Sequence, residues 1–278
     1  MSKIGIWSEV KLDILRDYAS AYSRILAAQQ QPPLQHIYID AFSGSGVHQA
    51  KGTGELVWGS PTSVLLVEPA FTAYHFIDLD RGNIEALKEM VMSRSTGPYD
   101  PSTVRFYNGD CNDVLLSKVF PTVNFKDYRR ALCLLDPYGL HLDWQVIQTA
   151  GQMRSIEVFL NFPIHDMNRN VLFRDSKKAD PKQVARLTRY WGDESWRDAA
   201  YSTQGNLFGL EEKTRNEVVV GAFRDRLKEV AGFKHVSPAL AMRNSKGATL
   251  YYLLFASQKP VAAKIVEDIF GKHGGGKG

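Results

Sequence analysis

The hydrophobic pattern divides the chain into one long amphipathic segment and a series of short apolar runs. Over residues 7–30, apolar side chains recur every three or four positions, which predicts a helix with one buried face. Helix-like patterns separate several of the later apolar runs, and this alternation is typical of a parallel, doubly wound sheet. The predicted strands cover 36–40, 74–78, 103–107, 131–136 and 156–161, and the predicted helices between them cover 61–67, 83–93 and 142–152.

The alternation stops after residue 163. Residues 164–215 are polar and charged, and we expect a helical insertion there. The pattern then predicts a helix over 214–230 and an antiparallel hairpin with strands at 236–242 and 249–256. The sequence thus predicts a mostly parallel α/β chain in five segments: an N-terminal helix on the core (1–35), an α/β half expected to bind a cofactor (36–163), the insertion (164–215), a helix and hairpin that complete the sheet (216–270), and a disordered tail (271–278).

Composition and charge narrow the class of protein. The 278 residues are 44% hydrophobic and 23% charged, which is enough to bury a full core. A net charge of +4 allows nucleic acid as a partner without demanding it. Cys111 and Cys133 lie far apart and lack metal-ligand spacing, so we expect neither a disulfide framework nor a metal site. With no signal peptide and no membrane-spanning apolar run, we expect a cytoplasmic protein, and its oligomeric state is left open.

Polar residues end several of the predicted strands. Asp40, Asp78, Asp136 and Asn161 stand at strand ends, and Asp110 follows another strand after a short turn. In doubly wound sheets, ligands bind outside the carboxyl ends of the strands. The sequence therefore predicts a ligand site at this edge of the sheet.

The stretch HIYIDAFSGSGVH, residues 36–48, places two glycines just after the first predicted strand of the sheet. Gly44 and Gly46 lack a Cβ atom, so the backbone can turn tightly and approach a ligand. A dinucleotide fingerprint needs a third glycine near position 49, where Gln49 stands. The pattern favours a different cofactor loop, and a plain turn after a buried strand is the alternative.

Four stretches, taken in order, resemble class I S-adenosylmethionine-dependent methyltransferases with a Rossmann-like sheet. In that family, the acid that ends the second strand accepts the ribose hydroxyls of the cofactor, a task that suits the two oxygens of a carboxylate. Asp78 has that position in YHFIDLD; Asp80 is the rival, or else it caps the next helix. The resemblance also assigns cofactor contacts to the first loop: Asp40, Phe42, Gly44 and Gly46.

The other two stretches resemble the adenine-binding and acceptor-binding parts of that family. In YNGDCNDVL, Asp110 and its neighbour Cys111 match the loop whose acid lies near the adenine amino group, with an ordinary turn as the alternative. In LLDPYGLH, Asp136-Pro137-Tyr138 resembles the Asp-Pro-Pro-Tyr motif of amino-methyltransferases, one proline short, which displaces the ring by one position and counts against base-amine chemistry. A structural turn at a strand end is the alternative. In the family motif, the acid and a proline carbonyl bind the target amine while the ring stacks on the base. The resemblance therefore implies catalytic roles for these three residues.

The stretch FLNFPIHD follows the fifth strand and places three polar residues near the same edge. Asn161, His165 and Asp166 suit either substrate orientation and general-base chemistry, or capping and turn formation. The motifs YIDAFSGSG, WGSP, FIDLD, LLDPYG and FLNFPIHDMNRN also resemble the three-Cys-motif partner proteins, over nearly the whole chain. That resemblance implies a partner, a radical-S-adenosylmethionine-like protein with three cysteines, and no established substrate.

Three hypotheses follow for the function. The first is an S-adenosylmethionine-dependent methyltransferase that acts on a nitrogen of nucleic acid. The second is a catalytically silent binding module that keeps the fold. The third, a nicotinamide-dependent oxidoreductase, is disfavoured by Gln49. Cytosine-C5 methylation is also disfavoured, because neither Cys111 nor Cys133 follows a proline, as the nucleophile of that chemistry does.

Overall fold

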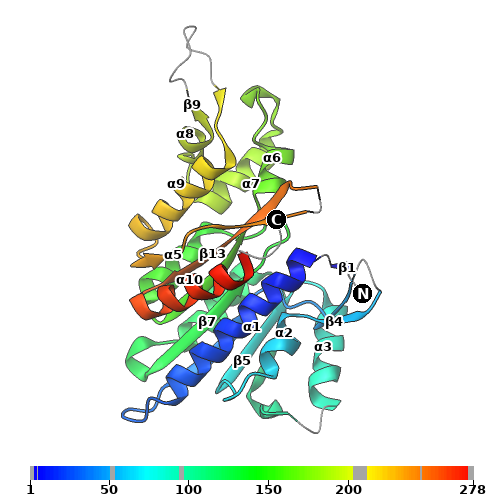
Figure 1. The fold of residues 1–278 in the computed structure, drawn as a ribbon, viewed down its shortest axis with the longest axis vertical. Coiled ribbons are helices and arrows are strands. Elements are labelled where there is room, and N and C mark those ends of the chain that lie inside the picture. Colours follow the sequence, from blue (N-terminus) through cyan, green and yellow to red (C-terminus); the bar gives the residue numbers. More distant parts are fainter. Residues whose placement is uncertain are drawn as a thin grey trace.

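The computed structural model (Figure 1) describes residues 3–4, 6–50, 54–93, 97–202, 212–244 and 246–274. Its centre is a mostly parallel eight-stranded sheet with helices on both faces, which confirms the predicted doubly wound, Rossmann-like α/β fold. The strands are β2 (Gln35–Asp40), β5 (Ala73–Asp78), β6 (Val104–Asn108), β7 (Arg129–Leu135), β8 (Ile156–Phe162), β11 (His235–Val236), β12 (Leu240–Arg243) and β13 (Thr249–Ser257).

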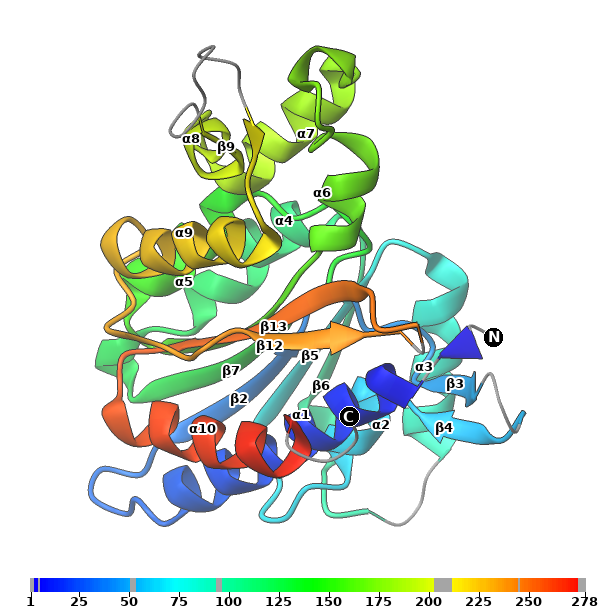
Figure 2. The ribbon, with the colours of Figure 1, turned by 45° about the horizontal axis from the view of Figure 1, so that its top comes forward.

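Helices cover the sheet on both sides (Figure 2). They are α1 (Ile6–Ala27), α2 (Ser60–Leu65), α3 (Arg81–Ser93), α4 (Cys111–Val114), α5 (Trp144–Met153), α6 (Ile164–Asn170), α7 (Pro181–Trp191), α8 (Trp196–Ala200), α9 (Asn216–Glu229) and α10 (Pro260–Gly274). No helix among the described residues is both long and apolar enough to cross a bilayer.

The order of the strands places β2 at the point where the chain reverses direction across the sheet. The order is β11-β13-β8-β7-β2-β5-β6, with β12 paired to β13. Strand β2 pairs in parallel with β5 on one side and β7 on the other, and β13 is antiparallel to β8. The carboxyl end of β2 is therefore the topological switch point, where ligands bind in such sheets.

The core has two parts, one on each face of the sheet. Because successive side chains of a strand point to opposite faces, Ile37 and Ile39 of β2 join one cluster and Tyr38 joins the other. The first cluster includes Phe223 of α9, and the second includes Tyr18 of α1. Burial on both faces explains why the strands read as nearly continuous apolar runs.

The predicted strands and helices of the parallel half are confirmed within a few residues, and the hairpin differs. Strand β12 starts at Leu240, whereas β11 pairs with the opposite end of β13. Between them, Ser237 Oγ accepts a hydrogen bond from Phe255 N at 3.1 Å, and Pro238 has no N–H to continue the ladder. The sequence also gave no prediction for β3 (Val47–Ala50) and β4 (Leu56–Trp58), which form a small sheet with β1 (Lys3–Ile4).

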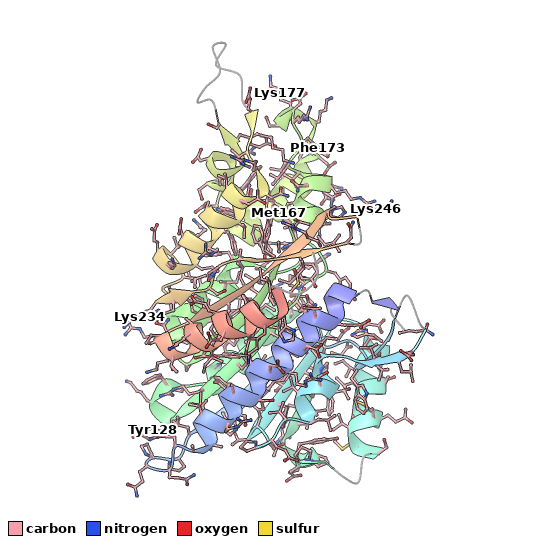
Figure 3. All side chains as sticks on the ribbon, viewed as in Figure 1. Tyr128, Met167, Phe173, Lys177, Lys234 and Lys246 are labelled. Carbon is pink, nitrogen blue, oxygen red and sulfur yellow. The ribbon has the colours of Figure 1, made fainter. Side chains whose placement is uncertain are left out.

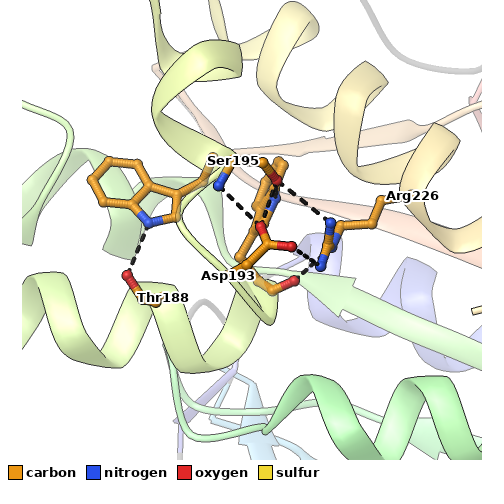
Figure 4. Close-up of polar contacts among 6 residues, drawn as sticks. Thr188, Asp193, Ser195 and Arg226 are labelled. Atoms are coloured by element: carbon orange, nitrogen blue, oxygen red, sulfur yellow. Dashed lines mark hydrogen bonds and ion pairs between the residues drawn. The ribbon is translucent and has the colours of Figure 1, made fainter. Parts of the chain in front are cut away.

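The stretch after β8 contains α6, α7 and α8 and a short antiparallel pair, β9 (Tyr201–Ser202) and β10 (Glu212–Lys213), with 203–211 outside the described residues. Figure 4 shows polar contacts between this stretch and Arg226 of α9. Arg226 of α9 donates to Trp191 O at 2.7 Å and pairs with Asp193 at 2.6 Å. Trp191 and Trp196 are each only 2% exposed, so both tryptophans anchor the core.

The C-terminal tail is ordered further than expected. Helix α10 continues through Gly274, so the prediction of disorder from residue 271 is wrong for 271–274. Residues 275–278 lie outside the described part of the chain.

Candidate functional site

The carboxyl end of β2 carries a fully buried acid. Asp40 is 0% exposed, and its carboxyl group accepts hydrogen bonds from Tyr38 Oη at 3.3 Å and Phe42 N at 3.2 Å. Burial raises the pKa of Asp40 to about 7, while a hydrogen bond from Ser60 and the one from Phe42 oppose the shift. Asp40 therefore holds the backbone of the turn through the hydrogen bond from Phe42 N, and the Phe42 side chain is half-buried.

The two glycines of the turn have different surroundings. Gly44 has φ +59°, and a Cβ atom there would meet nothing closer than His48 Cε1 at 4.0 Å. Gly46 has φ +80°, and a Cβ atom there would lie 2.8 Å from Leu87 Cδ1 and 3.0 Å from Thr62 Oγ1. Thr62 Oγ1 also donates to Gly46 O at 2.7 Å. Gly46 thus allows close packing against α2 and α3, and Gly44 is the glycine that faces open space.

Asp78, at the end of β5, ties two loops together. One carboxylate oxygen accepts from Gly44 N at 2.8 Å, and the other accepts from Asp80 N at 2.8 Å and Asn83 Nδ2 at 3.2 Å. A carboxylate offers about four acceptor positions, so Asp78 keeps capacity for a further donor. Asp80 accepts from Gly82 N at 2.7 Å, which is the capping contact that the sequence left as its alternative role.

The loop after β6 also forms a cap. Asp110 is exposed and accepts from Asn112 N at 2.8 Å at the start of α4. Cys111 is buried, and burial followed by the nearby Asp110 charge raises the pKa of its thiol to about 12. The rim is the edge of the sheet formed by the carboxyl ends of β2, β5, β6, β7 and β8. Asn112 links this loop to the segment after β7 along the rim, because its side chain donates to His141 O at 3.0 Å and accepts from Asp143 N at 2.8 Å.

Asp136, just after β7, is held by residues that are distant in the sequence. It forms an ion pair with Lys11 of α1, and Asn161 Nδ2 donates to its Oδ1 at 2.7 Å. The side chains of Lys11 and Asp136 are only 12% and 25% exposed. Burial alone would lower the pKa of Lys11, but the Asp136 carboxylate raises it above its ordinary value. The ammonium group also lies 5.6 Å from the centre of the Tyr251 ring.

Lys11 is the residue of this site that the sequence reasoning missed. It stands 125 positions before Asp136, and a lysine on an amphipathic helix ordinarily belongs to the solvated face. The Asp40 charge also contributes to its raised pKa, so Lys11 lies within electrostatic range of both acids at the rim. The one available signal was its place in the helical pattern, directly before the apolar Leu12.

The aromatic ring of the Asp-Pro-Tyr motif points to solvent. Pro137 is buried, whereas Tyr138 is 78% exposed. The turn continues with Gly139 at φ +67°, where a Cβ atom would lie 2.6 Å from Asp166 Oδ2. The turn therefore packs closely on α6, and the Tyr138 ring stays largely exposed.

Two buried oxygen atoms near this turn have no hydrogen-bond partner among the described residues: Asn161 Oδ1 and Asp166 Oδ2. Asp166 Oδ1 accepts from Asn170 Nδ2 at 2.8 Å, which is a contact within α6. His165 is exposed. Buried acceptors without donors are uncommon, so this side of the rim is short of N–H and O–H groups.

The chain does not form a dinucleotide site after β2. A dinucleotide fold needs a helix to begin directly at the glycine turn, so that its N-terminus meets the pyrophosphate. Here the chain continues from Gly46 into strand β3, which contains Gln49, and α2 begins only at Ser60. The geometry agrees with the sequence in disfavouring a nicotinamide-dependent enzyme.

Five of the predicted residues, together with Lys11, form two connected groups at the rim. Hydrogen bonds join Gly44, Asp78 and Asp80, and a second network joins Lys11, Asp136 and Asn161. The two groups lie at the ends of adjacent strands, β2 and β7, whose register pairs Asp40 with Leu134.

Comparisons with solved structures support the fold. Protein LPL1258 from Legionella pneumophila aligns with a TM-score of 0.53 at 11% identity, covering 96% of this chain and 94% of that chain. A candidate S-adenosylmethionine-dependent methyltransferase from Listeria monocytogenes aligns at 0.42 and 11% identity, over 88% and 99%. The methyltransferase domain of bacterial CtHen1 aligns at 0.41 and 12% identity, over 88% and 99%.

Of these three alignments, the one with LPL1258 has a TM-score above 0.5, and it shows a shared fold and nothing about activity. No family model and no curated protein matches the chain. The resemblance to the three-Cys-motif partner proteins therefore stays a prediction.

Proposed function

We propose that the protein is an S-adenosylmethionine-dependent methyltransferase whose acceptor is a nitrogen atom of nucleic acid. The observation that carries the proposal is Asp136, a largely buried carboxylate held by Asn161 at the carboxyl end of β7. It follows directly after β7, the strand next to β2, and the turn after β2 presents Gly44, which donates to Asp78 at the end of β5. A cofactor turn beside an acceptor acid at the switch point is the arrangement that methyl transfer to an amine requires.

The residues at the ends of β2, β5 and β6 fit the cofactor. Gly44 faces open space with a left-handed backbone, so the chain can approach a ligand there. Asp78 keeps capacity for a ribose hydroxyl, and Asp110 is exposed at the next loop. The buried Asp40 and Gly46 would support this surface from behind. When bound, S-adenosylmethionine supplies an electrophilic methyl group.

The acceptor side depends on Asp136. Asn161 holds Oδ1, and the Lys11 ammonium contacts Oδ2, so an acceptor amine must share or displace Lys11 at that oxygen. Positioning the amine in this way lowers the entropy that the reaction has to lose. The carbon–nitrogen bond would form as the methyl carbon–sulfur bond of the sulfonium breaks, with that electron pair left on sulfur in S-adenosylhomocysteine. Asp136 is placed to accept the proton that the nitrogen gives up.

Basic residues on the stretch after β8 support nucleic acid as the acceptor. Lysine and arginine contacts to phosphates supply most of the affinity in such complexes. Figure 3 shows Phe173 and Lys177 at the end of the molecule farthest from α1, beyond the rim. The ion pairs of the described residues do not include the basic side chains there: Arg169, Arg174, Lys177 and Lys178. The exposed Tyr138 ring is also available to stack on a base.

The test is to measure cofactor binding and methyl transfer separately. S-adenosylmethionine is titrated into the wild type and Asp136→Asn by calorimetry, and transfer of labelled methyl to single-stranded DNA and RNA is followed. We expect Asp136→Asn to bind the cofactor like the wild type and to lose transfer by roughly 100-fold or more. Asp127→Asn, an exposed acid near the start of β7, is the matched control. No binding by the wild type would end the proposal, and equal loss of binding and transfer would move Asp136 to the cofactor site.

A silent binding module is the second candidate. It is favoured by Lys11, which already forms an ion pair with Asp136. It is also favoured by Tyr138, whose ring is exposed and lies one position away from the aromatic position of the family motif. In that case the wild type binds the cofactor and transfers no methyl group. We propose that the partner implied by the family resemblance, a radical-S-adenosylmethionine-like protein with three cysteines, then supplies the chemistry. Transfer that appears only after such a protein is added would support this second candidate.

A further inference from the structure

A cavity of about 160 Å³ lies at the opposite edge of the sheet from the rim. It is lined by the C-terminal half of α1, the first residues of β7 and β8, and the residues that lead into α10. Helices α1 and α10 lie side by side there, over the sheet (Figure 1). A cavity of this size holds about five water molecules or a ligand of similar volume. Because it adjoins the amino ends of the strands, it is separate from the proposed methyltransferase site.

Cations outnumber acids in the wall of this cavity. Arg130, Arg154 and Lys259 contribute three positive charges, against the one carboxylate of Glu157. Both oxygens of Glu157 already accept hydrogen bonds, one from Tyr18 Oη and one from Ser257 Oγ. The wall therefore has an excess of positive charge that no side chain in it offsets.

Arg130 is fixed in place without being neutralised. Its Nη1 donates to Phe125 O at 3.1 Å and Arg129 O at 2.7 Å, and the guanidinium lies 3.6 Å from the centre of the Phe125 ring. Among the described residues, Nε and Nη2 have no acceptor. A preorganised guanidinium with free N–H groups is suited to a carboxylate or phosphate. Partial burial also lowers the pKa of Arg130, an effect that a bound anion would counter.

Tyr22 contributes a second unsatisfied donor to the wall. The residue is 6% exposed, and its hydroxyl group is buried without a partner among the described residues. Its ring stacks on Phe71 with centroids 5.9 Å apart, so its orientation is fixed. Burial raises the pKa of this hydroxyl, the nearby Glu157 charge raises it further and the Arg130 charge lowers it, so the acid and the cation both lie near the hydroxyl. Buried hydroxyl groups without a partner are uncommon in proteins.

We propose that this cavity is an anion site that takes a phosphate group, either free or in a small phosphate monoester. Near neutral pH a phosphate monoester is close to a dianion, which matches the excess of two positive charges in the wall. Arg130 and the Tyr22 hydroxyl supply directional donors. Helix α10 begins at Pro260, directly after Lys259, so the positive end of its dipole adds to the same field.

The test is calorimetric titration of inorganic phosphate into the full chain, with ionic strength held constant by sodium chloride. We expect one saturable site with a Kd of about 1 mM or lower. Tyr22→Phe and Arg130→Gln should each weaken binding by about tenfold or more, because each removes a donor to a charged ligand. Arg16→Gln, which changes an exposed arginine of the same helix, should bind phosphate like the wild type.

A second measurement guards against misfolded variants. Without phosphate, Tyr22→Phe should have a Tm equal to or above that of the wild type, since its hydroxyl has no partner to lose. A clearly lower Tm would show that the hydroxyl is already satisfied and would overturn its assignment as a ligand donor. Arg130→Lys keeps the positive charge but loses the planar guanidinium with its several N–H donors, so it should bind phosphate with intermediate affinity. No saturable binding, or the same weak heat in every variant, would overturn the site.

Discussion

The two halves of the rim are held together in different ways. At the ends of β2 and β5, the loops bond to one another: Gly44 donates to Asp78 across adjacent strands. At the ends of β7 and β8, Asp136 depends on Lys11, which comes from the N-terminal helix. The first half is thus built from the loops of the sheet itself, and the second half is completed by α1.

This difference has a consequence for function. The hydrogen bonds of the first half, from Gly44 N and Asp80 N to Asp78, do not involve α1. In the second half, a shift of α1 would remove the Lys11 ammonium group that forms an ion pair with Asp136. We therefore expect cofactor binding and acceptor binding to respond separately to changes in α1.

The largest effect should come from the buried acid of the first half. Asp40 has a pKa of about 7 in the folded protein against 3.8 in the unfolded chain, so the folded state binds more protons between these values. Its contribution to stability is present below pH 3.8 and is lost as the pH rises through 7. The loss should reach about 4 kcal/mol.

Urea unfolding between pH 4.5 and 8 checks this, with Asp40→Asn compared at each pH. The difference in free energy of unfolding between the two proteins should change steadily with pH and level off above pH 7. Asp127→Asn, an exposed acid at the other edge, should follow the wild-type curve. Parallel curves for Asp40→Asn and the wild type would show that Asp40 ionises normally.

The two glycines offer the next contrast, within the first half. Gly46→Ala should destabilise the fold by about 3 kcal/mol, since the new Cβ meets Leu87 and the backbone is left-handed. Gly44→Ala has the same backbone cost with open space around it, so about 1 kcal/mol is expected. Yet Gly44→Ala should weaken S-adenosylmethionine binding more strongly. Chemical denaturation and calorimetry measure the two effects, and a reversed order of binding losses would make Gly46 the cofactor contact.

Lys11 tests the independence of the two halves. Lys11→Met leaves Asp136 without its cation and should cost about 2 to 3 kcal/mol, less than for a fully buried pair. The double variant Lys11→Met, Asp136→Asn should recover part of that loss, which a double-mutant cycle measures. Cofactor affinity should change little in either variant. A large loss of cofactor affinity in Lys11→Met would show that the two halves act as one site.

The same contrast explains how much could be predicted from the sequence. The β2, β5 and β6 ends follow from local patterns, because an apolar run followed by an acid and a glycine specifies both the strand and its turn. The order of such acids along the chain was enough to place Asp40, Asp78 and Asp136 at one edge. The sequence could not predict that Gly44 and Gly46 have different surroundings, because only the packing of Gly46 against Leu87 distinguishes them.

Long-range contacts account for what the sequence could not predict. The Lys11–Asp136 pair joins positions 125 residues apart, and no local pattern encodes it. The exposure of Tyr138 follows from the packing of Gly139 on Asp166, again between separate elements. The split of the C-terminal hairpin had a local signal in Pro238, whose missing N–H cannot extend a strand pair.

The smallest of these effects should come from the acids at the β5 and β6 ends. Asp78→Asn replaces a charged acceptor for Gly44 N and Asp80 N with a neutral one and should cost about 2 kcal/mol. Asp110→Asn should cost less than about 0.5 kcal/mol, because asparagine caps a helix as well as aspartate does. If Asp78 also binds the ribose, its variant should lose cofactor affinity by about tenfold or more, while Asp110→Asn loses less. Equal losses of cofactor affinity would mean that Asp78 only stabilises the loops, and another residue of the first half would then have to accept the ribose hydroxyls.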